Sequence, residues 1–222
     1  MTDSTHPLTL AVLISGGGTT MMNLADRIER GALPARIGLV LASNEGPAAA
    51  GLEQAKARGL PTLTLPRRNH EDTASYSAAV FDAVRAVNAD LVCMAGFLSL
   101  LKIPGDFEHR VLNIHPALLP GFGGKGMHGQ HVHAAVLAAG LKVSGCTVHV
   151  ADNSYDTGPI VVQRTCRVEN NDTPETLAAR VFEQECAAYP AAVAAFAEGR
   201  VHFDKSVCYV MRPERKGKKG AS

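Results

Sequence analysis

Two side chains suited to acyl transfer lie at the end of a short apolar run, Val111-Leu112-Asn113-Ile114-His115-Pro116. Side chains alternate between the two faces of a β-strand, so Asn113 and His115 share one face, and Pro116 ends the strand. An amide can donate to a developing oxyanion, and an imidazole can move a proton near neutral pH. The pair therefore predicts direct acyl transfer, although either residue alone is as often an ordinary polar group at a strand end.

A third candidate, Asp156, lies in the turn Asp152-Asn153-Ser154-Tyr155-Asp156-Thr157-Gly158-Pro159. If the fold brings its carboxylate to His115, the negative charge raises the pKa of the imidazole and suits it to proton transfer. The alternative is an Asx-type turn, in which the carboxylates of this segment bind only local backbone. Spacing along the chain leaves both interpretations open.

A glycine-rich turn, Ser15-Gly16-Gly17-Gly18-Thr19-Thr20, joins a predicted strand to a predicted helix. Free backbone N–H groups and the positive end of the helix dipole meet there, so the turn suits a phosphate. It lacks the third glycine of a dinucleotide fingerprint and the Gly-Lys-Ser/Thr ending of a P-loop. A nucleotide monophosphate therefore fits best, and a tight turn with threonine caps and no ligand is the alternative.

A second glycine-rich loop, residues 121–129, follows the Asn/His strand and looks like a mobile flap. Its Lys125 either meets a phosphate or carboxylate or is an ordinary solvated lysine. The nearby His128, His131 and His133 do not form a metal motif, because residues 131 and 133 do not share a helical face and no Cys or acidic residue separates them. We therefore expect no metal.

The elements that must position these residues follow a βαβ rhythm. Strands are expected at residues 8–14, 37–42, 62–65, 91–95 and 111–115, with helices at 20–30, 47–58 and 73–87. This alternation predicts an α/β protein with a doubly wound, mostly parallel, Rossmann-like sheet, whose strand ends form the ligand crevice. Residues 143–151 and 160–168 indicate two antiparallel strands in the C-terminal part, and a long helix begins at Thr173-Pro174.

Length and composition indicate one globular domain. The 222 residues are 46% hydrophobic and 19% charged, without a repeat or an evident linker. We expect a single domain over residues 1–210 and a basic, disordered tail over residues 211–222. The tail carries five Lys or Arg and one Glu, which leaves the body at a net charge of −3, unsuited to nucleic acid. A weak polyanion contact of the tail is the minority alternative.

Two further patterns bear on the location of the protein. No apolar stretch approaches the roughly 20 residues of a membrane span, and no basic segment precedes the first apolar run. The five cysteines form an odd set without a Cys-x-x-Cys pair, so no disulfide framework is expected. These patterns predict a cytoplasmic protein.

Four blocks resemble the glycinamide ribonucleotide formyltransferases, within the folate-dependent formyltransferase superfamily, along the chain from Leu10 to about Val201. They are L-I-S-G-G-G-T-T at 13–20, A-G-F-L-S-L-L at 95–101, L-N-I-H-P-A-L-L-P at 112–120 and T-V-H-V-A-D-N-S-Y-D-T-G-P at 147–159. The resemblance implies formyl transfer from 10-formyltetrahydrofolate to the amine of glycinamide ribonucleotide in purine biosynthesis. It also implies that Asn113, His115 and Asp156 are the catalytic set.

The same resemblance implies the binding residues. Gly18, Thr19 and Thr20 are expected to bind the ribonucleotide phosphate, and Glu185 the ribose or glycinamide portion. The reduced folate is expected to lie against Leu98, Ser99, Leu100 and Leu101 and against the loop residues Asp152, Asn153, Ser154 and Tyr155. The alternatives are ordinary core leucines and an exposed helical glutamate.

The chain departs from the family pattern at three places. Gly18-Thr19-Thr20 replaces Gly-Ser-Asn, Ser99 replaces a basic residue, and Thr73 stands where a basic residue is usual, unless Arg67 and Arg68 supply it. These changes leave the amine acceptor open, so a formyltransferase for another amine, such as an amino sugar, is one alternative. A folate- or nucleotide-binding module without turnover is another. The expected partners are small-molecule substrates, with neither nucleic acid nor membrane, and the oligomeric state is open.

Overall fold

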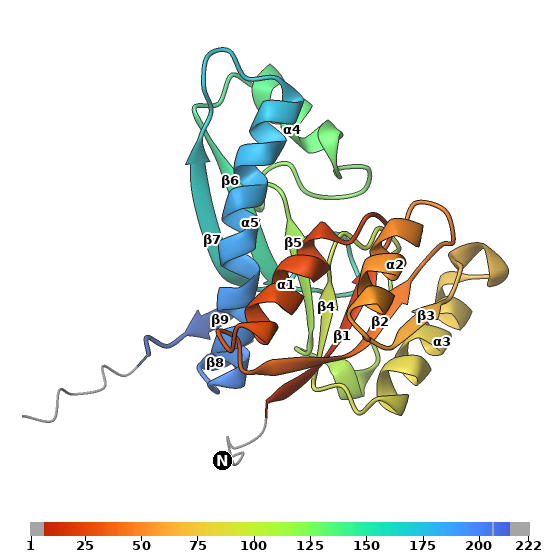
Figure 1. Ribbon diagram of the computed structural model, residues 1–222. Helices are drawn as coiled ribbons and strands as arrows, with labels where there is room; N and C mark the ends of the chain where they lie inside the picture. Colours follow the sequence, from red (N-terminus) through yellow and green to blue (C-terminus); the bar gives the residue numbers. More distant parts are fainter. Residues whose placement is uncertain (1–6, 206, 214–222) are drawn as a thin grey trace, which may run out of the picture.

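The computed structural model describes residues 7–205 and 207–213. Seven strands form one sheet in the order β3-β2-β1-β4-β5-β6-β7, and two more form a separate hairpin (Figure 1). The sheet consists of β1 (Leu8–Ile14), β2 (Ala35–Ala42), β3 (Thr62–Thr64), β4 (Leu91–Met94), β5 (Val111–His115), β6 (Val143–Val150) and β7 (Ile160–Arg167). The hairpin consists of β8 (Val201–Asp204) and β9 (Val207–Val210).

The strands from β3 to β5 in sheet order run parallel, whereas β6 and β7 each pair antiparallel with the strand before them. β1, β2 and β4 are almost entirely buried, as expected of parallel strands covered on both faces. β7 is an edge strand, and most of its side chains are exposed or half-buried. The predicted α/β class, with a mostly parallel sheet and antiparallel strands in the C-terminal part, is confirmed.

Helices cover both faces of the sheet. They are α1 (Thr19–Glu29), α2 (Ala49–Ala57), α3 (Thr73–Ala86), α4 (Gln130–Ala138) and α5 (Pro174–Ala197), with short 3-10 turns at Arg67–Asn69 and Gly105–Phe107. One apolar cluster joins α1, α2 and α5 to one face through Met21, Leu52 and Tyr189, and a second joins α3 to the other face through Val80 and Phe81. This arrangement is the doubly wound fold that the sequence predicts.

The predicted elements agree with the observed ones to within two residues at each end. The start of α5 is as expected, because Thr173 caps the helix reciprocally with Thr176 and Pro174 occupies the first turn. Two features were not predicted, namely α4 and the β8–β9 hairpin. α4 starts after Gly129 without a capping side chain, so the usual sequence signal for a helix start is missing.

Residues 214–222, most of the expected basic tail, lie outside the described residues, and the single-domain assignment stays a prediction. In the described part of the chain, no helix is both long and apolar enough to cross a membrane. All five cysteines are free thiols.

Candidate active site

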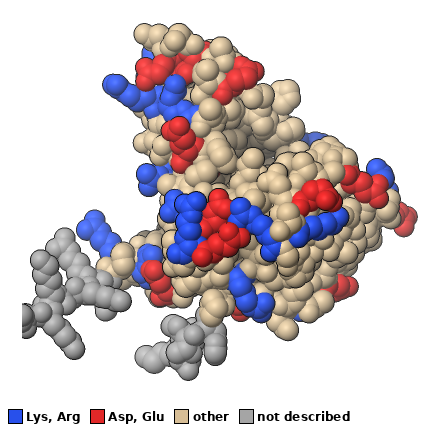
Figure 2. All heavy atoms as spheres, viewed as in Figure 1, with Lys and Arg blue, Asp and Glu red and all other residues tan. Residues whose placement is uncertain are grey.

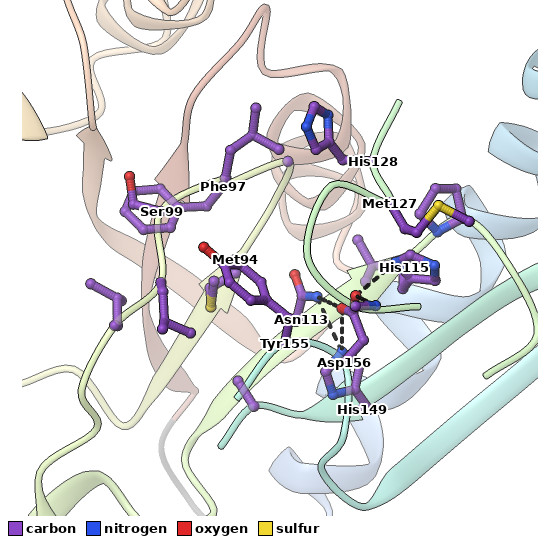
Figure 3. Close-up of a pocket in the computed structure, with 18 of the residues that line it drawn as sticks. Met94, Phe97, Ser99, Asn113, His115, Met127, His128, His149, Tyr155 and Asp156 are labelled. Atoms are coloured by element: carbon purple, nitrogen blue, oxygen red, sulfur yellow. Dashed lines mark hydrogen bonds and ion pairs between the residues drawn. The ribbon is translucent and has the colours of Figure 1, made fainter. Parts of the chain in front are cut away.

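A pocket opens at the carboxyl ends of β4 and β5, where an open α/β sheet favours ligand binding. Its lining comes mainly from residues 94–103 after β4, 113–116 around the end of β5, 124–129 before α4, and 149–156 at the end of β6. Figure 2 shows that this face of the molecule is hollowed between the part that holds α4 and the part that holds α1 and α2. Polar side chains from β5, β6 and the following loop gather in the pocket (Figure 3).

Asn113 and His115 both line the pocket, as the alternation along β5 predicts. The Asn113 Nδ2 atom lies 3.1 Å from His149 Nε2 and 3.4 Å from Asp156 Oδ1. His149 Nδ1 lies 3.1 Å from the carbonyl oxygen of Val150, which only accepts, so Nδ1 carries a hydrogen, and Nε2 accepts from the amide. Both N–H groups of Asn113 therefore have partners, and the longer contact, to Asp156, is the weaker one.

His115 is buried between a backbone carbonyl and a carboxylate. Its Nε2 donates to the Phe122 carbonyl at 2.7 Å, and its Nδ1 lies 3.5 Å from Asp156 Oδ2. Because a carbonyl only accepts, Nδ1 is the atom that takes up a second proton. Burial lowers the pKa of His115, while Asp156 and the Phe122 carbonyl act in the opposite direction. The net pKa lies below the usual value, so the ring is neutral near pH 7 and accepts its proton beside Asp156.

Asp156 contacts both β5 residues. Its Oδ2 also accepts the backbone N–H of Gly124 at 2.9 Å. Burial alone would raise the pKa of Asp156, but the nearby His149 ring, the Gly124 N–H and the His115 ring lower it overall. The carboxylate is therefore ionised at neutral pH, next to the nitrogen of His115 that can be protonated.

The backbone of the Asp156 turn is shaped by two unusual positions. Asp156 has a left-handed φ of 57°, which is uncommon for a residue other than glycine but best tolerated by Asp and Asn. An added Cβ on Gly158 would lie 1.9 Å from the Val150 carbonyl oxygen, so only glycine lets the turn lie this close to β6. The Asp-x-Gly sequence thus holds the carboxylate over the end of β5.

The Asx-turn interpretation of Asp156 is wrong, and Asp152 has that role. The Asp152 carboxylate accepts the backbone N–H of Ser154 at 2.9 Å and the Thr157 hydroxyl at 2.9 Å. The turn therefore has one carboxylate for its own backbone and another for the pocket.

The glycine-rich turn at residues 15–20 lies at the start of α1. Gly18 is the N-cap with a left-handed φ of 76°, and no side chain caps the helix, so the expected threonine caps are absent. Of the predicted phosphate-binding residues, Thr20 lines the pocket, whereas Gly18 and Thr19 lie outside its lining. An added Cβ on Gly16 or Gly17 would meet nothing within 4 Å, so the backbone of this turn is open to a ligand.

Most of the predicted folate-contacting residues line the same pocket. They are Leu98, Ser99, Leu100, Leu101, Asp152, Ser154 and Tyr155. Leu98 is 54% exposed and Leu101 is 3% exposed, so the core interpretation fits Leu101 but not Leu98. Asn153 differs, because its Oδ1 accepts the Ile103 N–H at 2.8 Å and the residue lines a neighbouring depression instead.

The two arginines weighed as substitutes for a basic residue at Thr73 do not line the pocket. Arg68 pairs with Glu45, and Arg67 donates to the His70 carbonyl at 2.8 Å. Lys125 of the second glycine loop is exposed and does not line the pocket either.

Glu185 of α5 also lines the pocket, although it lies far along the chain from Thr20 and from Asn113. It is half-buried, so the interpretation as an exposed helical glutamate is wrong. Burial raises the pKa of its carboxyl from 4.5 to about 7. The side chain can therefore act as a neutral donor or a charged acceptor near physiological pH.

Known proteins resemble this chain along most of its length. A family model described as formyl transferase matches residues 8–193. The chain belongs to the formyl transferase family. Phosphoribosylglycinamide formyltransferase from Haemophilus influenzae is 33% identical over 203 residues, covering 90% of this chain and 92% of that protein. A solved structure of glycinamide ribonucleotide transformylase 1 from Symbiobacterium toebii has a TM-score of 0.87 at 34% identity, covering 94% of this chain and 96% of that chain.

The plant relatives are longer than this chain. The chloroplastic phosphoribosylglycinamide formyltransferase of Arabidopsis thaliana is 39% identical over 195 residues, which cover 86% of this chain. The chain spans 66% of the length of that relative. The expected cytoplasmic location of the present protein stays a prediction.

His149 is a site residue that the sequence analysis did not single out. It is buried on β6 as the cross-strand partner of Asn113 in the antiparallel β5–β6 pair. Its Nε2 lies 3.6 Å from Asp156 Oδ1, so the ring contacts two of the three predicted catalytic residues. Only the strand register brings His149 there, and the one sequence signal was its place three residues before Asp152, where the turn begins.

The histidines around α4 have no shared ligand set. His128 and His131 meet edge to face with ring centroids 5.7 Å apart, and His128 lines the pocket. His133 is buried near His115. In residues 7–205 and 207–213, no three His, Cys, Asp or Glu side chains are grouped as a metal site requires.

Proposed function

We propose that this protein transfers the formyl group of 10-formyltetrahydrofolate to the amine of glycinamide ribonucleotide, the formylation step of purine biosynthesis. One observation carries the proposal. The Asp156 carboxylate contacts both the Asn113 amide and the neutral His115 imidazole within one pocket. Acyl transfer between two amines needs these groups, a donor for the oxyanion and a pair that moves protons. Two bacterial relatives are named for glycinamide ribonucleotide or phosphoribosylglycinamide, and the match covers more than 90% of each. Both observations support glycinamide ribonucleotide as the acceptor.

In this proposal Asn113 stabilises the oxyanion. The acceptor nitrogen attacks the formyl carbon, and the carbonyl oxygen gains the negative charge. The Asn113 N–H that contacts Asp156 at 3.4 Å turns to this oxygen, because that hydrogen bond is long and weak. The His149 bond at 3.1 Å keeps the amide plane in place during the exchange.

His115 and Asp156 move the protons. The attacking amine must lose a proton, and the folate N10 must gain one as its bond to the formyl carbon breaks. Asp156 assists the transfer of the first proton from the amine to Nδ1 of the neutral His115 and stabilises the imidazolium that results. The imidazolium then gives its Nε2 proton to the folate N10 as the bond from N10 to the formyl carbon breaks. Since Nε2 is bound to the Phe122 carbonyl, the 121–129 loop has to release it before His115 can reach N10.

The two substrates enter from opposite walls of the pocket. The reduced folate lies against Leu98 to Leu101 and the Asp152 to Tyr155 loop, and the ribonucleotide phosphate lies on the open backbone of Gly16 to Thr20. Glu185 meets the ribose or glycinamide portion, which places the acceptor amine between Thr20 and Asn113. No step requires a metal.

The proposal is tested by following deformylation of 10-formyltetrahydrofolate with three reaction mixtures. They contain glycinamide ribonucleotide, an amino sugar nucleotide or no acceptor. We expect stoichiometric deformylation with glycinamide ribonucleotide alone. Turnover only with the amino sugar would replace the acceptor, and folate binding without turnover in any mixture would identify a binding module.

A further inference from the structure

A single buried hydroxyl links the helix that carries Glu185 to the strands that carry the rest of the site. Tyr189 is fully buried on α5, one helical turn after Glu185. Its hydroxyl oxygen lies 3.1 Å from the Met94 carbonyl and 3.0 Å from the Leu112 carbonyl. In Figure 1, α5 runs along β7 and along β6, the neighbour of β5 in the sheet.

The two carbonyls belong to the strand ends that form the pocket. Met94 is the last residue of β4 and the register partner of Asn113, and Leu112 immediately precedes Asn113 on β5. Met94 also lines the pocket and leads into the predicted folate wall. The hydroxyl thus bonds to the carbonyl directly before Asn113 on β5 and to the carbonyl of its register partner Met94 on β4.

The Tyr189 hydroxyl is suited to this position as a permanent donor. Complete burial raises its pKa well above the usual value, so it keeps its hydrogen across the working pH range. One hydrogen is shared between two carbonyl oxygens at similar distances, which holds the two strand ends at a fixed separation from the helix.

The helix needs such an anchor because Pro190 follows directly. Proline has no N–H, so the carbonyl of Cys186 loses its intrahelical partner. The Arg27 guanidinium approaches this carbonyl at 3.5 Å, at the limit of a hydrogen bond. The backbone between Glu185 and Pro190 therefore has one backbone hydrogen bond fewer than a regular helix. The position of this backbone segment decides how far the Glu185 side chain reaches into the pocket.

We propose that Tyr189 is a positioning residue, whose hydroxyl fixes the spacing between Glu185 on the acceptor side and Asn113 at the reacting carbon. It touches neither substrate and acts through those two residues. The inference rests on the proposed function, because it assigns Glu185 to the acceptor. A displacement of about 1 Å between groups that hold two reactants can cost on the order of 100-fold in rate.

The test replaces Tyr189 by phenylalanine and compares it with Tyr76→Phe. Tyr76 is the matched control, since it is equally buried and its hydroxyl has no hydrogen-bond partner among the described residues. We expect Tyr189→Phe to lower single-turnover transfer between about 10- and 100-fold and to leave folate affinity within about twofold. Tyr76→Phe should change neither. Equal behaviour of the two variants would overturn the proposal.

A double-mutant cycle separates positioning from general loss of structure. If Tyr189 acts through Glu185, the Tyr189→Phe/Glu185→Gln variant loses less activity than the product of the two single losses. Losses that multiply, or a loss that disappears after correction for the folded fraction, would indicate a purely structural tyrosine and contradict the proposal.

Two further measurements keep the inference testable if a variant is unstable or the acceptor is different. Tyr189→4-aminophenylalanine keeps a donor and should retain transfer, whereas the isosteric Tyr189→4-methylphenylalanine should not. The side-chain amide NMR signals of Asn113 should shift in Tyr189→Phe and not in Tyr76→Phe, without any substrate present. Unshifted signals would refute the positioning role, whereas a wild-type protein that transfers nothing would refute the proposed function alone.

Discussion

At the scale of single residues, the account depends on one carboxylate with several partners. Asp156 lies within 3.6 Å of groups from Asn113, His115 and His149. The pairing of Asn113 with His115 could be predicted, because alternation along one strand is a local property. Spacing alone could not place Asp156 there, and only the family resemblance implied it, because its position depends on the close approach of Gly158 to β6. His149 was not predicted, since its position depends on the β5–β6 register.

Asn113→Ala should lower kcat by about 10²- to 10³-fold with little change in substrate affinity, because an oxyanion donor acts mainly in the transition state. The measurement is steady-state kinetics under conditions where chemistry limits turnover. Asn170→Ala, at an exposed loop position, is the control and should behave like the wild type. Near-normal turnover of a folded Asn113→Ala protein would exclude the oxyanion role.

Asp156→Asn should depress the rate and move the acid limb of the pH–rate profile to lower pH. Burial already lowers the pKa of His115, and the Asp156 charge is the strongest influence that raises it. Without that charge the pKa falls further, so the neutral imidazole persists to lower pH while its protonated form loses a partner. An acid limb that stays in place or moves to higher pH would contradict this assignment.

At the scale of elements, the glycine turn before α1 is the segment where we expect an anion to bind. The sequence predicted the turn because glycines between a strand and a helix are a local signal, whereas α4 was missed because no capping side chain marks its start. Whether the turn holds a phosphate depends on space above the backbone, which the chain order does not reveal. The open surroundings of Gly16 and Gly17 supply that information.

Gly17→Ala should weaken glycinamide ribonucleotide binding and leave both folate binding and the melting temperature nearly unchanged. Its φ is not left-handed and the added methyl group meets no atom within 4 Å, so a loss of binding reports contact with the ligand. Gly31→Ala is the control for backbone strain, since Gly31 has a left-handed φ of 67° in equally open space away from the pocket. Unchanged ribonucleotide affinity in Gly17→Ala would remove the phosphate from this turn.

At the scale of the whole molecule, α5 packs on a sheet whose first strand, β1, lies more than 150 residues earlier in the sequence. This packing brings the half-buried carboxyl of Glu185 into the pocket. No local pattern could predict the pKa of Glu185, because its burial depends on the packing of α5 against the sheet. A carboxyl whose folded pKa is raised stabilises the protein below the unfolded pKa of 4.5. That contribution is lost as the pH rises through about 7.

Glu185→Gln should therefore gain stability relative to the wild type as the pH rises from about 5 to about 8, because glutamine carries no charge to bury. Thermal unfolding at the two pH values measures the difference. Glu183→Gln, at an exposed position on the same helix, should show no such trend. A stability difference that is constant with pH would mean that the Glu185 carboxyl titrates normally.

In the proposed reaction, this pocket transfers a formyl group from the folate to an amine through Asn113 and His115. The most direct measurement is a single turnover with 10-formyltetrahydrofolate labelled at the formyl carbon, in the presence of glycinamide ribonucleotide. The wild type should transfer the label to the ribonucleotide amine at the same rate at which the folate loses its formyl group. The Asn113→Ala/His115→Ala variant should bind both substrates and transfer almost none. Label recovered as free formate, or transfer by the double variant at the wild-type rate, would contradict the account.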